Sequence, residues 1–217
     1  MPECPHCHSS NVIKISTKNV KVGDYIKFGN YPQTSHGQIQ PIEWQVLSIE
    51  NNRMLVISRY GLEAKRFDIG SNNWENSEIR KWLNGEFYNK SFNENEKKFI
   101  RNSSISTIVY KGGFLGIGRK EELSYTNDRV FLLSKEEAKK YFVNDDVIKC
   151  KATNYAKKNG AYVDSDDGGY SHWWLRSPFP YSGGGDVYIV FSGGNIFSCY
   201  VDCLVPNLAR PALWINL

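Results

Sequence analysis

The sequence has no long hydrophobic run, and this absence narrows what the protein can be. No apolar stretch approaches the ~18–20 residues that a membrane-spanning helix needs. The first residues, MPECPHCHSS, lack a basic start followed by an apolar stretch, so we expect no secretory signal and no membrane span. We therefore expect a protein that is cytoplasmic at synthesis, while its final location stays open.

Cysteine is scarce, and a strong charge of one sign is missing. The five cysteines are an odd number and unevenly spaced among 217 residues, which makes a poor disulfide framework and favours a reduced protein. The formal net charge of +4 and the isoelectric point of about 8.7 permit contact with nucleic acid without arguing for it. The hydrophobic content of 41% and the aromatic content of 14% exclude a disordered chain.

Residues 1–18 differ from the rest and are interpreted as a short zinc-knuckle-like arm. Cys4 and Cys7 form a C-x-x-C turn, whose two thiolates can share one face of a zinc ion. A structural zinc site needs four ligands and a second C-x-x-C is absent, so the other two thiolates would come from a second chain in a homodimer. A degenerate ribbon that holds no metal is the equally open alternative.

The remaining chain, residues 19–217, is predicted to be one α+β domain. Apolar residues recur over 42–49 and 54–58 on either side of Asn51–Asn52, which predicts a β-hairpin. Helical patterns occupy the middle of the chain, and glycine-punctuated strands fill its last third. We expect strands from both ends of the domain to pair in one sheet, with the helices packed around it.

Capping residues predict where the helices begin. The expected caps are Ser77, then Ser91 and Asn93 ahead of Glu94 and Glu96, and Ser134 with Glu137. A helical face shared by residues 148, 152, 155 and 156 predicts a further helix that ends at Gly160. The glycine-rich segment 111–120 is typical of a hairpin tip, and the acidic segment 164–169 is typical of a solvated loop.

Six motifs along the chain carry a resemblance. They are GDYIKFGNYPQ, PIEWQVL, NSEIRKWLN, DRVFLLSKEEAKKYF, WWLRSP and RPALWINL, in this order. Together they resemble a bacterial domain family of unassigned function with a C-type-lectin-like fold, akin to that of the formylglycine-generating enzymes. The resemblance spans about residues 20–217. It implies a ligand-binding domain with a mixed sheet formed by N- and C-terminal strands.

In some members of that family, the segment between WWLRSP and RPAL is the variable region of a diversity-generating retroelement in a bacterium or phage. An error-prone reverse transcriptase rewrites adenines there, and the resulting codons cannot encode Lys, Glu, Gln, Met or Trp. These five types make up about one residue in five of the chain, yet residues 179–208 contain none of them. A buried glycine-rich strand region would also lack Lys and Glu, but it would not explain the many aromatic residues. The resemblance implies a hypervariable face directed at a protein or other macromolecular target.

Strand alternation predicts the orientation of this segment. Val187 and Ile189 are expected to point inward, which turns Asp186, Tyr188 and Val190 outward. The expected ligand-binding residues are Phe179, Tyr181, Ser182, Asp186, Tyr188, Val190, Phe191, Ser192, Asn195, Phe197, Ser198, Cys199, Tyr200, Asp202, Cys203 and Leu204. The expected fixed frame is Trp173, Trp174, Leu175, Arg176, Arg210, Pro211 and Trp214, with the two arginines holding carboxylates or backbone carbonyls.

An oxidase-type enzyme is the alternative. Formylglycine-generating enzymes use a cysteine pair with copper near the C-terminus, and Cys199 and Cys203 lie in a comparable region. Residues four apart on an extended strand are ~13 Å from each other, too far to share a metal unless the chain bends, so two incidental thiols are expected. The sequence shows no Ser–His–Asp or paired-carboxylate arrangement and none of the calcium motifs of C-type lectins. We therefore expect a non-enzymatic binding protein, with zinc at the arm as the one candidate cofactor.

Overall fold

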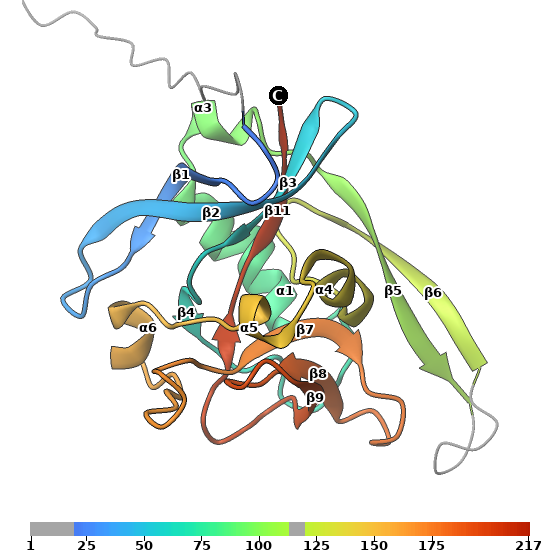
Figure 1. Ribbon diagram of the computed structural model, residues 1–217. Coiled ribbons are helices and arrows are strands. Elements are labelled where there is room, and N and C mark those ends of the chain that lie inside the picture. Colours follow the sequence, from blue (N-terminus) through green and yellow to red (C-terminus); the bar gives the residue numbers. More distant parts are fainter. Residues whose placement is uncertain (1–19, 113–119) are drawn as a thin grey trace, which may run out of the picture.

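Two β-sheets, one above the other, organise the computed structural model, which describes residues 20–112 and 120–217 (Figure 1). The upper sheet has the order β1-β2-β3-β11. Its strands are β1 (Tyr25–Pro32), β2 (Ile39–Glu50), β3 (Arg53–Ser58) and β11 (Ala212–Asn216). The first and last strands of the described chain therefore share one sheet, as expected. Every pair in it is antiparallel, so the prediction that this sheet is mixed is wrong.

The hairpin between β2 and β3 is confirmed in place and in turn chemistry. Asn51 and Asn52 both have positive φ, 49° and 59°. A two-residue turn with this geometry matches the right-handed twist of the strands that it joins, and asparagine tolerates it better than most residues. Trp44, Val46 and Ile57 are fully buried, so this hairpin supplies much of the upper core.

The lower sheet has the order β4-β10-β7-β8-β9 and carries most of the predicted variable segment. Its strands are β4 (Glu63–Ala64), β10 (Leu208–Ala209), β7 (Trp173–Pro178), β8 (Asp186–Val190) and β9 (Ile196–Tyr200). β10 pairs parallel with β7, and the other pairs are antiparallel, so this sheet is the mixed one. β9 lies at the edge of the sheet, and its Phe197 and Tyr200 are exposed.

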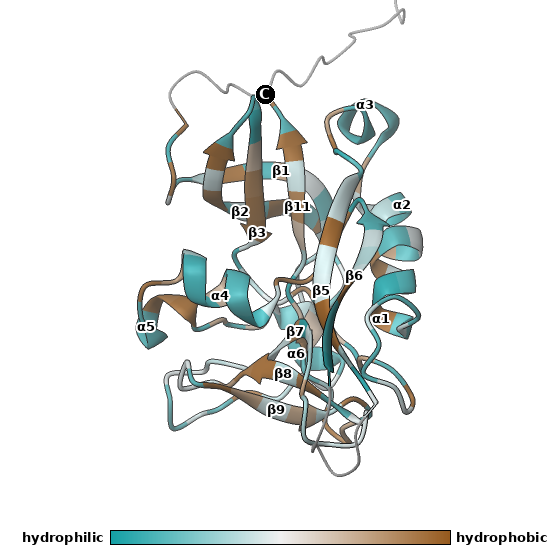
Figure 2. Cartoon of the chain, turned by 90° about the vertical axis from the view of Figure 1, so that its right-hand side faces the viewer, coloured by the Kyte–Doolittle hydropathy of each residue, from teal (hydrophilic) through white to brown (hydrophobic). Residues whose placement is uncertain are grey.

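A third strand pair connects the levels of the two sheets. β5 (Ser103–Lys111) and β6 (Lys120–Asp128) form an antiparallel hairpin that runs down one side of the molecule (Figures 1 and 2). The pairing continues to Lys111 opposite Lys120, which agrees with a hairpin tip in the glycine-rich segment. Residues 113–119 lie outside the described residues. The end of β5 near Lys111 reaches the level of β7, and the two strands are in contact.

The helices are short, and α1, α3 and α4 begin at predicted caps. They are α1 (Glu78–Trp82), the π-helical turn η1 (Leu83–Phe87), α2 (Tyr88–Ser91), α3 (Glu94–Lys97), α4 (Lys135–Tyr141), α5 (Asp145–Ile148) and α6 (Asn154–Lys158). Ser77 caps α1, and Asn93 and Ser134 form capping boxes at α3 and α4. Ser91 ends α2 instead of capping α3. Figure 2 shows α4 with a mostly hydrophilic surface, while the strands carry the hydrophobic stretches.

The continuous helix predicted from residue 148 to Gly160 is wrong. Ile148 ends α5, and the next helix starts only at residue 154, where Thr153 caps it. Between them, Cys150 forms a β-bridge with Ser171, and residue 152 forms another with Gly61. These backbone pairings with distant segments compete with the local helical hydrogen bonds, and they prevail.

The two predicted frame arginines are buried, and both donate hydrogen bonds to distant parts of the chain. Arg176 donates to the carbonyl oxygens of Leu132 at 2.7 Å and Ser106 at 2.8 Å, and to both carboxylate oxygens of Glu137. Arg210 donates to the carbonyls of Ser58 at 3.0 Å and Ile148 at 3.1 Å. The prediction that these arginines hold carboxylates and backbone carbonyls is confirmed. They connect β7 and the segment before β11 to the rest of the fold.

None of the helices in residues 20–112 and 120–217 combines the length and the apolar character of a membrane span. The predicted arm at residues 1–18 lies outside the described residues. The zinc site predicted there at Cys4 and Cys7 therefore stays a prediction.

Candidate ligand-binding site

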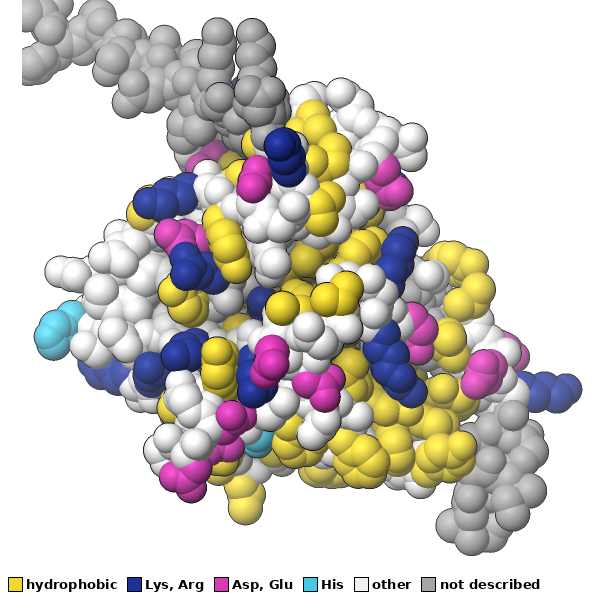
Figure 3. Space-filling view, viewed as in Figure 1, with side chains coloured by type: hydrophobic (Ala, Val, Ile, Leu, Met, Phe, Trp, Pro, Cys, Tyr) yellow, Lys and Arg dark blue, Asp and Glu magenta, His cyan; other side chains and the backbone are white. Residues whose placement is uncertain are grey.

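Four aromatic side chains meet where β7, β8 and β9 face solvent. The ring of Phe179, just after β7, lies 5.6 Å from that of Tyr181, 5.3 Å from that of Tyr188 and 5.9 Å from that of Phe197, between centroids. We call these four residues the aromatic face. Tyr181 is 73% exposed and Phe197 is 61% exposed, and Figure 3 shows a continuous hydrophobic surface over this part of the molecule.

A lysine outside the predicted segment anchors one member of the aromatic face. Lys135 is the first residue of α4, and its Nζ donates to the Tyr188 hydroxyl at 2.9 Å. The same ammonium group lies 4.1 Å from the centroid of the Tyr188 ring. The backbone N–H of Lys135 donates to the Ser177 hydroxyl at 2.9 Å. Because both ends of Lys135 are held, Tyr188 has a defined position before any ligand arrives.

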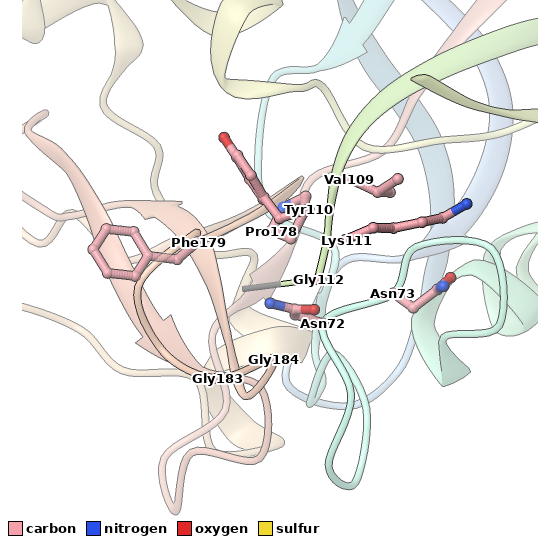
Figure 4. Close-up of a pocket in the computed structure, with 10 residues that line it drawn as sticks. All are labelled: Asn72, Asn73, Val109, Tyr110, Lys111, Gly112, Pro178, Phe179, Gly183 and Gly184. Carbon is pink, nitrogen blue, oxygen red and sulfur yellow. The ribbon is translucent and has the colours of Figure 1, made fainter. Parts of the chain in front are cut away.

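A groove of about 330 Å³ borders the aromatic face. Figure 4 shows it between the end of β5 and the loop after β7, with Phe179 on one side and Lys111 and Asn73 on the other. Tyr110 of β5 also lines it. Burial raises the pKa of Tyr110, and the nearby Glu121 carboxylate raises it further. The groove extends the face onto an element that sequence reasoning missed.

The loop between β7 and β8 is tied to the body of the protein. Asn72 donates from its backbone to the Gly184 carbonyl at 2.8 Å and from its side chain to the Asp186 carbonyl at 2.9 Å. Gly184 has a φ of 106°, a conformation that other residues avoid. A Cβ at Gly185 would lie 2.9 Å from the ring of Tyr200, so this ring rests directly on the loop backbone. The loop therefore presents Tyr181 from a fixed base.

The predicted ligand-binding residues divide into three groups by exposure. Those exposed are Tyr181, Asn195, Phe197, Tyr200 and Leu204. Those half-buried are Phe179, Ser182, Asp186, Tyr188, Phe191, Ser198, Cys199, Asp202 and Cys203. Those buried are Val190 and Ser192.

Val190 and Ser192 are corrections to the predicted site. Val190 is fully buried opposite Trp173, where the end of β8 packs into the core on both sides instead of alternating. Ser192 is 5% exposed, and its hydroxyl donates to Asp164 at 2.8 Å. These residues support the fold and offer no surface to a ligand. The inward orientation predicted for Val187 and Ile189 is confirmed.

Phe191 belongs to a separate ring stack. Its ring lies 4.8 Å from that of His172, which stacks at 4.3 Å on Tyr162. The backbone N–H of Ser192 donates to His172 Nδ1 at 2.9 Å, so the imidazole acts there as an acceptor and must be neutral at that nitrogen. Burial lowers the pKa of His172, against a smaller opposing effect of Asp164.

This histidine makes stability depend on pH. Because the folded pKa lies below the ordinary 6.5, the unfolded chain takes up a proton first as the pH falls, so the free energy of unfolding should decrease below about pH 6.5. We expect His172→Gln to reduce this decrease in the free energy of unfolding. Denaturant unfolding at about one pH unit above and about one below pH 6.5 measures it. His36→Gln, at an exposed loop position, is the control. An equal decrease in both variants would contradict the prediction.

Cys199 and Cys203 are closer than an extended strand would allow. β9 ends at Tyr200, and the chain turns at residues 201–202, so the two thiols lie close enough for each to shift the pKa of the other. The Cys203 sulfur also lies 2.7 Å from the Tyr200 carbonyl oxygen, and Asn207 donates to it at 3.6 Å. The separation expected for an extended strand does not apply to this pair, because the chain bends at residues 201–202. Across residues 20–112 and 120–217, no three His, Cys, Asp or Glu side chains gather in a way that could hold a metal ion.

One comparison with known proteins gives a match. A family model described as a domain of unknown function (DUF6273) matches residues 51–217, which include the aromatic face and both sheets except β1 and β2. No curated protein matches the chain, and no solved structure matches it. The match covers well over half of the chain. The protein therefore belongs to this family of unassigned function, which agrees with the expectation of a domain family without an assigned function.

Proposed function

We propose that this protein is a non-enzymatic binding module whose segment 179–208 presents a ligand-binding face to a macromolecular target. The observation that carries the proposal is the aromatic face, together with Tyr200 at its border. Solvent-exposed aromatic rings that contact one another are unusual on a protein surface and mark interaction sites. Tyr181, Phe197 and Tyr200 are each more than half exposed.

The chemistry of the face suits a protein partner. Tyrosine and phenylalanine offer large contact areas with only two side-chain torsions to immobilise, and the neighbouring exposed Asn195 adds adaptable hydrogen bonds. Tyrosine is also among the residues that most often dominate binding energy. Lys135, Asn72 and the buried Arg176 keep the face in place, which reduces the ordering cost of association.

We infer in addition that the domain has a C-type-lectin-like fold and that the segment is diversified by a retroelement. Support for the fold comes from the pairing of the first and last described strands in one sheet. Support for diversification comes from the missing Lys, Glu, Gln, Met and Trp in residues 179–208. The exposed members of that segment are residue types that rewritten adenine codons can encode.

Deep sequencing of the 3′ end of the gene from a population of source cells tests diversification. We expect substitutions to be confined to codons 179–208, at positions that are adenines in the template repeat, and to be most frequent at exposed residues such as Tyr181 and Phe197. Codons for the buried Val187 and Ile189 on β8 are the internal control and should stay constant. A uniform sequence across all these codons would contradict a diversified face.

A further inference from the structure

The turn after β9 brings two thiols together at the border of the candidate face. Cys199 lies on β9 opposite Val187, and Cys203 follows the turn. Both side chains are half-buried and form no disulfide, and they lie close enough for each thiol to shift the pKa of the other. Tyr200 lies between them in the chain and accepts a hydrogen bond from Cys203 at 2.7 Å.

We propose that Cys199 and Cys203 are a redox-modification site, at which a hydroperoxide oxidant joins the two sulfurs in a reversible intramolecular disulfide. This goes beyond the proposed binding function and stands on the thiol pair alone. The two groups already meet in the reduced fold, so little chain movement separates the reduced and oxidised states.

The reaction balances with hydrogen peroxide as the oxidant. The Cys199 thiolate attacks one peroxide oxygen, the O–O bond breaks, and, with one proton taken up, a sulfenic acid and a water form. The Cys203 thiol then attacks the Cys199 sulfur, the S–O bond breaks, and a second water leaves as the S–S bond forms. The two sulfurs together lose two electrons, and the peroxide gains them. A dithiol reductant reverses the change by exchange.

The surroundings assign the attacking role to Cys199. The Cys203 thiol donates its proton to the Tyr200 carbonyl oxygen at 2.7 Å, which keeps Cys203 in the thiol form. The interaction with Cys203 lowers the pKa of Cys199 to about 7, while the same interaction and burial raise the pKa of Cys203. The thiolate is the nucleophilic form of cysteine, so Cys199 reacts first and Cys203 resolves the sulfenic acid. Asn207, which donates toward the Cys203 sulfur at 3.6 Å, keeps this thiol near its partner.

The short loop between the sulfurs points to a switchable bond more than to a structural one. A disulfide stabilises a fold mainly by restricting the unfolded chain, and the effect grows with the length of the loop that it closes. The loop here has three intervening residues, Tyr200, Val201 and Asp202, so the bond adds little stability. Its formation would instead remove the Cys203 hydrogen bond to the Tyr200 carbonyl and fix the turn beneath an exposed ring.

The test is oxidation of the folded full-length protein with hydrogen peroxide, followed by iodoacetamide labelling, trypsin digestion and mass spectrometry. Residues 177–217 form one tryptic peptide, because Arg210 precedes a proline, and this peptide contains Cys199 and Cys203 as its only cysteines. We expect the peptide to lose two hydrogen atoms in mass and to carry no label after oxidation. A reducing agent should restore two labels.

Two comparisons make the test specific. Oxidation should be about fivefold faster in the folded protein than in urea at neutral pH, because the larger thiolate fraction outweighs the lower nucleophilicity of a less basic sulfur. Cys199→Ser and Cys203→Ser should each leave the remaining cysteine of this peptide without an internal partner, so the two-hydrogen loss disappears. Two labels on the wild-type peptide after oxidation, or a single stable sulfenic or sulfinic acid, would overturn the proposal.

Discussion

Replacing Tyr181, Phe197 and Tyr200 together by alanine is expected to abolish target binding while leaving the protein folded. All three side chains are more than half exposed, so their truncation should cost no more than about 1–2 kcal/mol of unfolding free energy in sum. Central aromatic residues of an interface commonly contribute about 2 kcal/mol or more each. A combined loss of at least about 4 kcal/mol is therefore expected, which corresponds to about a thousandfold weaker Kd.

The measurement is cross-linking in the source cells with tagged wild-type and triple-variant protein, combined with thermal unfolding of each purified protein. A matched control replaces Leu123 and Tyr125, which are similarly exposed at 57% and 62% on β6, away from the aromatic face. The control should keep the cross-linked partner that the triple variant loses. Retention of that partner by the triple variant, or unfolding of the triple variant, would contradict a binding role for these rings.

Local signals in the sequence predicted local structure well. The caps at Ser77, Asn93 and Ser134 are hydrogen bonds between groups at most three residues apart, so the chain needs nothing distant to form them. The Asn51–Asn52 turn likewise depends on two residues that tolerate positive φ. Burial of Val187 and Ile189 followed from strand alternation on a sheet with one covered face.

The errors and omissions all come from contacts between distant segments. The bend that joins Cys199 and Cys203 is held at Val201, whose N–H donates to the Gly185 carbonyl and whose carbonyl accepts from Phe67, each at 3.0 Å. No residue within the turn signals these bonds. Tyr110 and Lys135 lie on β5 and α4, far along the chain from residues 179–208, and only the folded arrangement brings them to the site.

The aromatic face and the core beneath it should respond oppositely to substitution. Trp174→Ala is expected to destabilise the fold by about 3–5 kcal/mol, since the indole is fully buried and its removal leaves a cavity. Its Nε1 donates to the Lys65 carbonyl at 2.6 Å, and its ring lies 5.8 Å from that of Phe67. Loss of this amount is a large part of the roughly 5–15 kcal/mol that stabilises a typical domain.

Guanidinium unfolding of wild type, Trp174→Ala and Trp174→Phe measures this effect. The phenylalanine variant keeps most of the apolar volume and removes the donor to Lys65, so a smaller loss of about 1–3 kcal/mol is expected from the unpaired carbonyl. The difference in unfolding free energy between Trp174→Ala and Trp174→Phe measures how much the packing of the ring contributes to stability. If Trp174→Ala cost less than the triple surface variant, β7 would not be the rigid base of the aromatic face. The distinction between a fixed frame and a variable surface would then fail for this protein.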